Sequence, residues 1–352
     1  MKLTNFILAA FALPLFLVSC SDDDNADVPS GAYDNGVLIL NQGGYLAGNA
    51  SVSFLKGDFT VENNIFSTVN NGLALGDVAQ DINFYGQYAY IVVNNSNKIE
   101  VVNRYTFQRI TSITTGINNP RYITFADGKG YVTNWGNPSV ATDDYVAVIN
   151  PETNVVTANI PVGEGPEKII SEGGKLYVAL KGGYGSNNKI AVINPATNVV
   201  TTNITVGDVP GSMEVVNGKL YVLAEGNLAW TGNETSAKLQ AINLETSTVA
   251  GTLTFADGVH PGNLVKSGST FFYTIDSKIF KVEAEAATVP ATPLATTPAA
   301  SVSAMSVING MLYVGDALNF ASAGKVYIYS LNGNLEHTIT AGIAPAGFYI
   351  NE

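Results

Sequence analysis

The sequence YVTN at residues 131–134, followed by VAVINPETN at residues 146–154, repeats within the chain. It recurs as IAVINPATN at residues 190–198, and in both copies a β-prone segment follows the last asparagine. Self-similarity at a spacing of roughly 40 to 50 residues is typical of arrays in which each repeat packs on its neighbours. We therefore expect further copies along the chain.

Seven copies align on one apolar strand. The equivalent residues are Leu38, Tyr90, Tyr131, Tyr177, Tyr221, Tyr273 and Tyr313, at successive spacings of 52, 41, 46, 44, 52 and 40 residues. Each copy continues with a loop, a second strand, a tight turn and a third strand. Each later copy is preceded by one more strand, which in several cases begins at a proline such as Pro120 or Pro166. Four strands per repeat predict an all-β fold, a seven-bladed β-propeller with four-stranded blades.

The two ends of the repeat region are complementary. The first copy begins at its second strand, residues 36–41, whereas residues 344–350 form a first strand without followers. We expect the C-terminal strand to complete the N-terminal blade, which closes the ring and leaves fewer free sheet edges. The propeller would span residues 33–352. In the sixth copy, residues 283–300 form an Ala, Thr and Pro run, which predicts an irregular outer edge.

The composition agrees with an all-β protein. Of 352 residues, 46% are apolar and 13% charged, and the chain is rich in Gly and Tyr, which suits short strands joined by turns. The formal net charge is −12, with only 17 basic residues. This charge argues against a nucleic-acid ligand, because phosphate binding needs clustered Lys and Arg. The acidity is more typical of solubility outside the cell.

The N-terminus predicts export and lipid anchoring. Residues 1–19 have the layout of a signal peptide, with Lys2 before a short apolar run. Cys20, the only cysteine, then follows in a sequence like that of a bacterial lipobox, which makes it the expected lipidation site. The alternative is a free thiol after an ordinary signal. Residues 20–32 form an acidic, flexible tether, whose acidic run at 22–24 either directs export to the surface or is simply solvated. We expect a lipid-anchored outer-membrane protein exposed at the cell surface.

The repeat resembles two known groups. The tetrapeptide at 131–134 is the one after which the YVTN repeat propellers are named, and residues 148–153 are similar to the segment that follows it there. A narrower resemblance is carried by residues 72–80, 90–96, 120–123, 314–317 and 342–345. These segments look like those of the surface propeller lipoproteins of Bacteroidota, the YncE-like or DUF5074 family. That family includes a protein that captures vitamin B12 and passes it to an outer-membrane transporter. The resemblance implies a corrinoid ligand and a transporter as partner.

The expected ligand site is the face of the propeller that carries the longer loops. These loops, residues 41–51, 134–144, 181–188, 225–237 and 316–324, join second to third strands and share a face with the junctions entering the first strands. The candidate ligand-binding residues are Gln42, Tyr45, Arg121, Trp135, Tyr184, Trp230, Asn319 and Phe320. Together the aromatics would form a wide, shallow cage for a large planar or amphipathic ligand. Alternatively, each aromatic pins its own loop, and Arg121 pairs with a neighbouring acid instead of binding a carboxylate or phosphate.

Residues for catalysis are sparse. The chain has two histidines, His260 and His337, in different repeats, which leaves a histidine-based metal centre without ligands. His260 follows no triad pattern and is expected to be a rim residue. Asp143 and Asp144 are either calcium ligands or, more simply, a solvated turn. Paired carboxylates for glycoside hydrolysis depend on a separation that sequence does not give. We expect no cofactor and no catalytic residues, and therefore a non-catalytic binding protein. The alternative function is an adhesion or scaffold protein that binds a protein or glycan.

Overall fold

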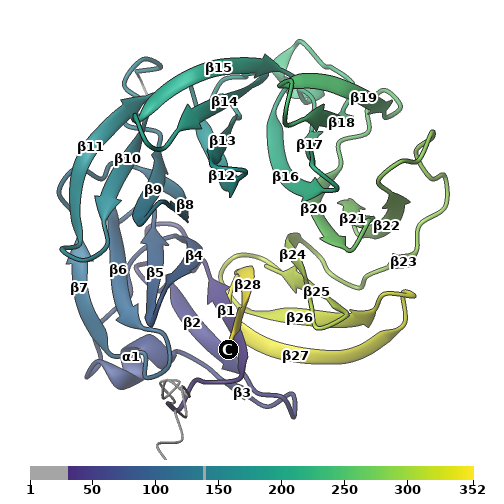
Figure 1. Ribbon diagram of the computed structural model, residues 1–352. Helices are drawn as coiled ribbons and strands as arrows, with labels where there is room; N and C mark the ends of the chain where they lie inside the picture. Colours follow the sequence, from purple (N-terminus) through teal and green to yellow (C-terminus); the bar gives the residue numbers. More distant parts are fainter. Residues whose placement is uncertain (1–30, 138–139) are drawn as a thin grey trace, which may run out of the picture.

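The computed structural model describes residues 31–137 and 140–352, which form seven four-stranded antiparallel sheets arranged in a ring (Figure 1). The predicted seven-bladed β-propeller is therefore confirmed.

Each blade contains four strands, ordered from the inner edge of the sheet to the outer edge. Blade 1 contains β28 (Pro345–Asn351), β1 (Gly36–Asn41), β2 (Ser51–Leu55) and β3 (Val61–Glu62); blade 2 contains β4 (Ala79–Tyr85), β5 (Tyr88–Val93), β6 (Lys98–Asn103) and β7 (Arg109–Ile113). Blade 3 contains β8 (Pro120–Ala126), β9 (Lys129–Asn134), β10 (Tyr145–Asn150) and β11 (Val155–Pro161); blade 4 contains β12 (Pro166–Glu172), β13 (Lys175–Leu180), β14 (Lys189–Asn194) and β15 (Val199–Thr205). Blade 5 contains β16 (Pro210–Val216), β17 (Lys219–Ala224), β18 (Lys238–Asn243) and β19 (Thr248–Thr254); blade 6 contains β20 (Gly262–Ser267), β21 (Thr270–Ile275), β22 (Lys278–Glu283) and β23 (Ala295–Thr296). Blade 7 contains β24 (Val302–Ile308), β25 (Met311–Asp316), β26 (Ala323–Ser330) and β27 (Leu335–Ile343).

The middle strands of each blade are buried because neighbouring blades cover both of their faces. The YVTN strand β9 has five consecutive buried residues, and four of the six residues of its partner β10 are buried. The apolar core is accordingly divided into seven clusters within the described chain, one at each interface between neighbouring blades. One such cluster joins Tyr131 and Val148 of blade 3 to Val178 and Ile193 of blade 4. Stability is thus built between neighbours rather than in one central core.

The repeated Asn-Pro turn carries a hydrogen bond across each of two successive interfaces. In blade 3, Asn150 Oδ1 accepts the backbone N–H groups of residues 152 and 153, and Asn154 adopts a positive φ of 55°. This geometry presents the Asn154 side chain to blade 2, where Tyr90 Oη donates to its Oδ1 at 2.8 Å. Asparagine tolerates the left-handed backbone that the turn requires, which explains why the repeat ends in this residue.

The ring closes as the sequence predicts. Strand β28 pairs antiparallel with β1, with Ile39 opposite Phe348. Asn351, at the end of β28, is fully buried, and its side-chain amide donates to the carbonyl oxygens of Tyr33 and Arg104. The C-terminal strand therefore ends beside β1 of blade 1 (Figure 1), and Asn351 also contacts Arg104 of blade 2.

The outer edges are less regular. The outer strand of blade 6, β23, has only two residues, in agreement with the predicted irregular edge. The outer strand of blade 1, β3, is equally short and is followed by helix α1 (Ile65–Val69), which the sequence pattern did not predict. This helix buries Ile65 and Phe66 in the cluster between blades 1 and 2. No helix in the described ranges is long and apolar enough to cross a membrane.

Candidate functional site

The five longer loops lie on one face, each tied back to the junction that enters its own blade. The backbone N–H of Trp135 donates to Asn119 O at 3.1 Å, that of Lys181 to Gly165 O at 2.7 Å, and that of Glu225 to Val209 O at 2.9 Å. We call this face the long-loop face. The same arrangement recurs at Gln42, whose N–H donates to Ala344 O at 2.8 Å. Because these contacts repeat, loop position on this face is set by the blade framework.

The main cavity of this face has a volume of about 910 Å³ and lies over blades 4, 5 and 6. Its aromatic wall consists of Tyr184 and Trp230, which are 77% and 80% exposed. Trp230 stands on a short 3-10 helix, η1 (Ala229–Thr231), inside the loop between β17 and β18. The polar lining includes the amides of Asn227, Asn233 and Asn263. Asn227 Oδ1 accepts from Ser186 Oγ and Asn263 Nδ2 donates to Thr274 Oγ1, whereas Asn233 is exposed. The cavity, which we call the blade 4–6 pocket, thus combines open aromatic faces with amide groups.

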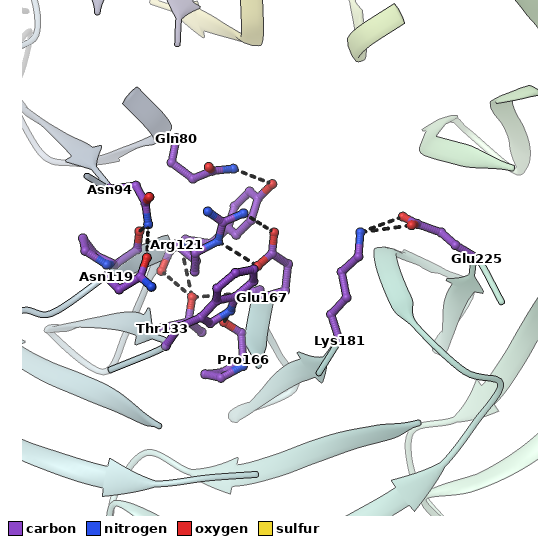
Figure 2. A network of polar contacts seen from close by, with 12 residues as sticks. Gln80, Asn94, Asn119, Arg121, Thr133, Pro166, Glu167, Lys181 and Glu225 are labelled. Carbon is purple, nitrogen blue, oxygen red and sulfur yellow. Dashed lines mark hydrogen bonds and ion pairs between the residues drawn. The ribbon is translucent and has the colours of Figure 1, made fainter. Parts of the chain in front are cut away.

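Two ion pairs follow each other around the inner rim (Figure 2). Arg121 forms a bidentate pair with Glu167, with Nε and Nη2 each 2.8 Å from a carboxylate oxygen. Lys181 contacts both carboxylate oxygens of Glu225, at 3.2 and 3.0 Å. Burial alone lowers the pKa of Lys181, but Glu225 and Glu167 outweigh it and hold the pKa above its usual value. Lys181 therefore lines the pocket as a charged ammonium group paired with Glu225.

Arg121, predicted to bind the carboxylate or phosphate of a ligand, is paired with Glu167 of the protein itself. Its side chain is 15% exposed and that of Glu167 is 8% exposed. Both guanidinium contacts are thus taken by a carboxylate of the next blade, which is the alternative that the sequence left open. The guanidinium also lies 4.3 Å from the ring of Trp135.

Trp135 is fixed by its surroundings. Its indole Nε1 donates to Pro166 O at 3.1 Å, and its ring packs edge-on against Tyr184 with centroids 5.9 Å apart. It is partly buried and does not line the blade 4–6 pocket. Trp135 is thus a support for the aromatic wall, whereas Tyr184 and Trp230 are its open faces.

The remaining candidates lie apart from this pocket. Gln42, Tyr45, Asn319 and Phe320 belong to the loops of blades 1 and 7, and none of them lines the blade 4–6 pocket. Tyr45 and Phe320 are 71% and 45% exposed, and Asn319 Oδ1 caps its own turn by accepting from residues 321 and 322. The expectation of a single cage from all five loops stays a prediction, and the blade 4–6 pocket contains aromatics from two of these loops, Tyr184 and Trp230. The short turns of blades 2 and 6 separate the aromatics into two arcs.

The acidic pair at residues 143 and 144 is engaged in loop structure. Asp143 accepts from the N–H of Asn137, and buried Asp144 accepts from Gly165 N–H at 2.5 Å. Burial raises the pKa of Asp144 to about 6, despite the Gly165 hydrogen bond, which lowers it. Across residues 31–137 and 140–352, no group of three or more His, Cys, Asp or Glu is placed to hold a metal ion.

Several polar residues of the site were not among the sequence candidates. They are Glu167, Lys181, Glu225 and the pocket amides. The repeat does contain information about Glu167. Pro120-Arg121 and Pro166-Glu167 occupy equivalent positions at the start of the inner strands of successive blades. Residues at equivalent positions of neighbouring inner strands lie side by side around the channel, so the pair was predictable from the alignment. His260 is a rim residue, as expected, and lines the pocket. Cys20 and the acidic tag at 22–24 lie outside the described residues.

The fold and site together define a seven-bladed β-propeller with an aromatic and amide-lined pocket on its long-loop face. The chain belongs to the DUF5074 family, a domain of unknown function, whose family model matches residues 35–341. No curated protein sequence matches the chain.

Solved structures show the same fold at low sequence identity. A quinonprotein alcohol dehydrogenase-like protein from Bacteroides thetaiotaomicron is 13% identical, with a TM-score of 0.68 over 91% of this chain and 79% of that one. A functionally unknown protein from Desulfotomaculum acetoxidans is 11% identical, with a TM-score of 0.67 over 90% and 98%. Hydrazine synthase from Kuenenia stuttgartiensis is 15% identical, with a TM-score of 0.62 over 80% and 89%. At these identities the likeness concerns the fold alone.

Proposed function

We propose that this protein is a non-catalytic, lipid-anchored surface propeller that captures a large planar ligand, a corrinoid, in the blade 4–6 pocket. The observation that carries the proposal is the combination of Tyr184 and Trp230, both largely exposed, with the amides of Asn227, Asn233 and Asn263 around one cavity of about 910 Å³. A corrinoid presents a flat macrocycle edged by amide side arms. Aromatic faces and amide hydrogen bonds are the chemistry that such a ligand requires.

The anchoring and the partner belong to the same proposal. Lipidation at Cys20 would hold the propeller at the outer membrane, beyond a flexible tether, and the ligand would pass to an outer-membrane transporter. Replacing Cys20 by serine should abolish incorporation of labelled palmitate and release the protein from the membrane. Retention of the label in this variant would contradict the anchoring.

The direct test is titration of the purified protein with cyanocobalamin, followed by gel filtration and visible absorbance of the protein peak. We expect stoichiometric retention of the red ligand and at least about tenfold weaker binding in Trp230→Ala, because aromatic anchors dominate such sites. Phe320→Ala is the matched control, since Phe320 is an exposed aromatic of the other arc and should leave binding unchanged. A colourless protein peak at micromolar concentrations would overturn the corrinoid assignment.

A second candidate function, binding of a glycan strand, is favoured by the continuity of the depression. The blade 4–6 pocket shares Gly183 and Tyr184 with a smaller cavity beside Trp135, and shares His260 and Asn263 with a cavity of about 450 Å³ towards blade 7. An extended ligand could follow this arc. Binding of linear oligosaccharides, lost in Trp230→Ala, together with no retention of cyanocobalamin would select this alternative.

A further inference from the structure

Among the residues that the structure describes, one polar contact joins the loop tip that carries Trp230 to another segment of the chain. Residues 228–234 are all exposed, and the hydrogen bonds of this tip are otherwise internal, such as Thr231 N–H to Leu228 O at 3.0 Å. In the part of the chain that the structure describes, its one polar contact to another segment joins Glu234 Oε1 and His260 Nε2 at 3.3 Å. His260 belongs to the junction that enters blade 6. This contact therefore ties the loop of Trp230, one of the two residues of the aromatic wall, to the junction that enters blade 6.

The strength of that contact depends on the charge of His260. Its Nδ1 lies 2.7 Å from the backbone carbonyl oxygen of Glu225, which can only accept, so Nδ1 carries a hydrogen. A neutral imidazole has a single N–H, and Nε2 then turns a lone pair towards the Glu234 carboxylate, which also only accepts. The protonated ring donates at both nitrogens. Both contacts are satisfied at once only in the imidazolium form.

The charged groups around His260 leave Glu234 as its partner. From blade 5, the Glu225 carboxylate is paired with Lys181 of blade 4. On the junction itself, Asp257 accepts from Ser236 Oγ at 2.6 Å. From blade 6, Asp276 lines the neighbouring cavity together with His260. Glu234, 40% exposed, is the carboxylate within contact distance of Nε2.

We propose that His260 is a positioning residue that latches the Trp230 loop against blade 6 when its ring is protonated and releases the loop when the ring is neutral. The latch rests on the proposed function, because it acts on the same pocket. Histidine is the side chain that ordinarily changes charge between about pH 5 and pH 8. A loop fixed in its binding conformation loses less freedom when the ligand enters, so the latched form binds more tightly.

The test uses Trp230 as its own reporter. The chain has two tryptophans, so Trp135→Phe leaves Trp230 as the only one, and its time-resolved fluorescence anisotropy is recorded from pH 5.5 to pH 8.5. We expect the fast local rotation of Trp230 to increase as the pH rises. Adding Glu234→Gln should abolish this pH dependence. Adding His337→Gln should preserve it, because His337 stacks on Phe59 between blades 7 and 1. Rotation that is independent of pH, or that responds to pH without Glu234, overturns the latch.

A second measurement needs no substitution and can be used if Trp135→Phe does not fold. In the unsubstituted protein, the two indole N–H signals are followed by heteronuclear NOE at pH 5.5 and pH 8.5, and that of Trp230 alone should lose rigidity at the higher pH. Neither readout contains a ligand, so the latch and the proposed function fail separately. If cyanocobalamin binds, its affinity should be up to about fivefold higher at the lower pH, the range for a single exposed ion pair, and this difference should vanish in Glu234→Gln.

Discussion

The hydroxyl of Tyr131 donates a hydrogen bond to the carbonyl oxygen of Pro195 at 3.1 Å, across the interface between blades 3 and 4. Tyr90 makes the same contact with Pro151 one blade earlier, at 3.3 Å. Two parts of one repeat, the strand tyrosine and the Asn-Pro turn, are thus complementary between neighbouring copies. The repeated sequence therefore determines the contact between neighbouring blades as well as the strands of each blade.

Removing the Tyr131 hydroxyl should weaken the interface between blades 3 and 4. We expect Tyr131→Phe to lower the free energy of unfolding by about 1 kcal/mol, the usual net worth of one hydrogen bond. Tyr177→Phe is the matched control, because blade 5 has Leu244 and Ser247 in place of the turn's proline and asparagine, and Tyr177 Oη has no hydrogen bond to any described residue. Urea denaturation of both variants gives the comparison. Equal losses would show that the hydroxyl contact is not what matters.

The Arg121–Glu167 pair predicts a larger effect. Glu167→Ala would leave a largely buried guanidinium without its carboxylate, and we expect a loss of about 3 kcal/mol in the free energy of unfolding. The double variant Arg121→Met and Glu167→Ala removes the stranded charge and should recover part of that loss. Arg121→Met alone gives the reference value. If the stability losses of the two single variants simply add up in the double variant, the two residues do not interact.

The raised pKa of Asp144 predicts a pH dependence of stability. Because its pKa in the folded protein is about 6, above its ordinary 3.8, the folded state holds a proton between about pH 4 and pH 6 that the unfolded state has lost. Stability therefore falls as the pH rises through this window. Asp144→Asn should be more stable at pH 7 by about 1 to 2 kcal/mol, since a neutral amide can still accept from Gly165 N–H. Thermal melts of the two proteins should converge near pH 4, and a constant difference at all pH values would contradict this cause.

The ring closure gives a fourth prediction. Asn351 is fully buried, accepts from Arg104 Nε at 2.6 Å and donates to two carbonyl groups. Asn351→Ala leaves these groups unpaired and should cost about 2 to 3 kcal/mol, with faster amide exchange in β1 and β28. Asn319→Ala, which removes an exposed turn cap, should cost about 1 kcal/mol or less. Similar losses in both variants would contradict the special role of Asn351.

The sequence was sufficient for the framework because the repeat is a local pattern. The Tyr131 strand and the Asn150 turn recur at a regular spacing, and the orphan strand at residues 344–350 predicted how the ring closes. Helix α1 was missed because five residues between short polar segments give no helical period.

The site was less predictable. The separation of Tyr45 from Trp230 depends on which blades carry short turns. The hydrogen bond of Trp135 to Pro166 joins a loop of blade 3 to the start of β12, 31 residues further along the chain. The pair of His260 and Glu234 belongs to two loops of different blades, and no spacing in the chain links them.

The pairing of β28 with β1 also imposes an order in time. These strands are neighbours in the sheet, yet about 300 residues separate them along the chain. At a translation rate of about 5 to 20 residues per second, β1 emerges from the ribosome roughly 15 to 60 s before its partner. During that interval the inner edge of β1 has no strand to pair with. Blade 1 is therefore the first to be translated and the last to be finished.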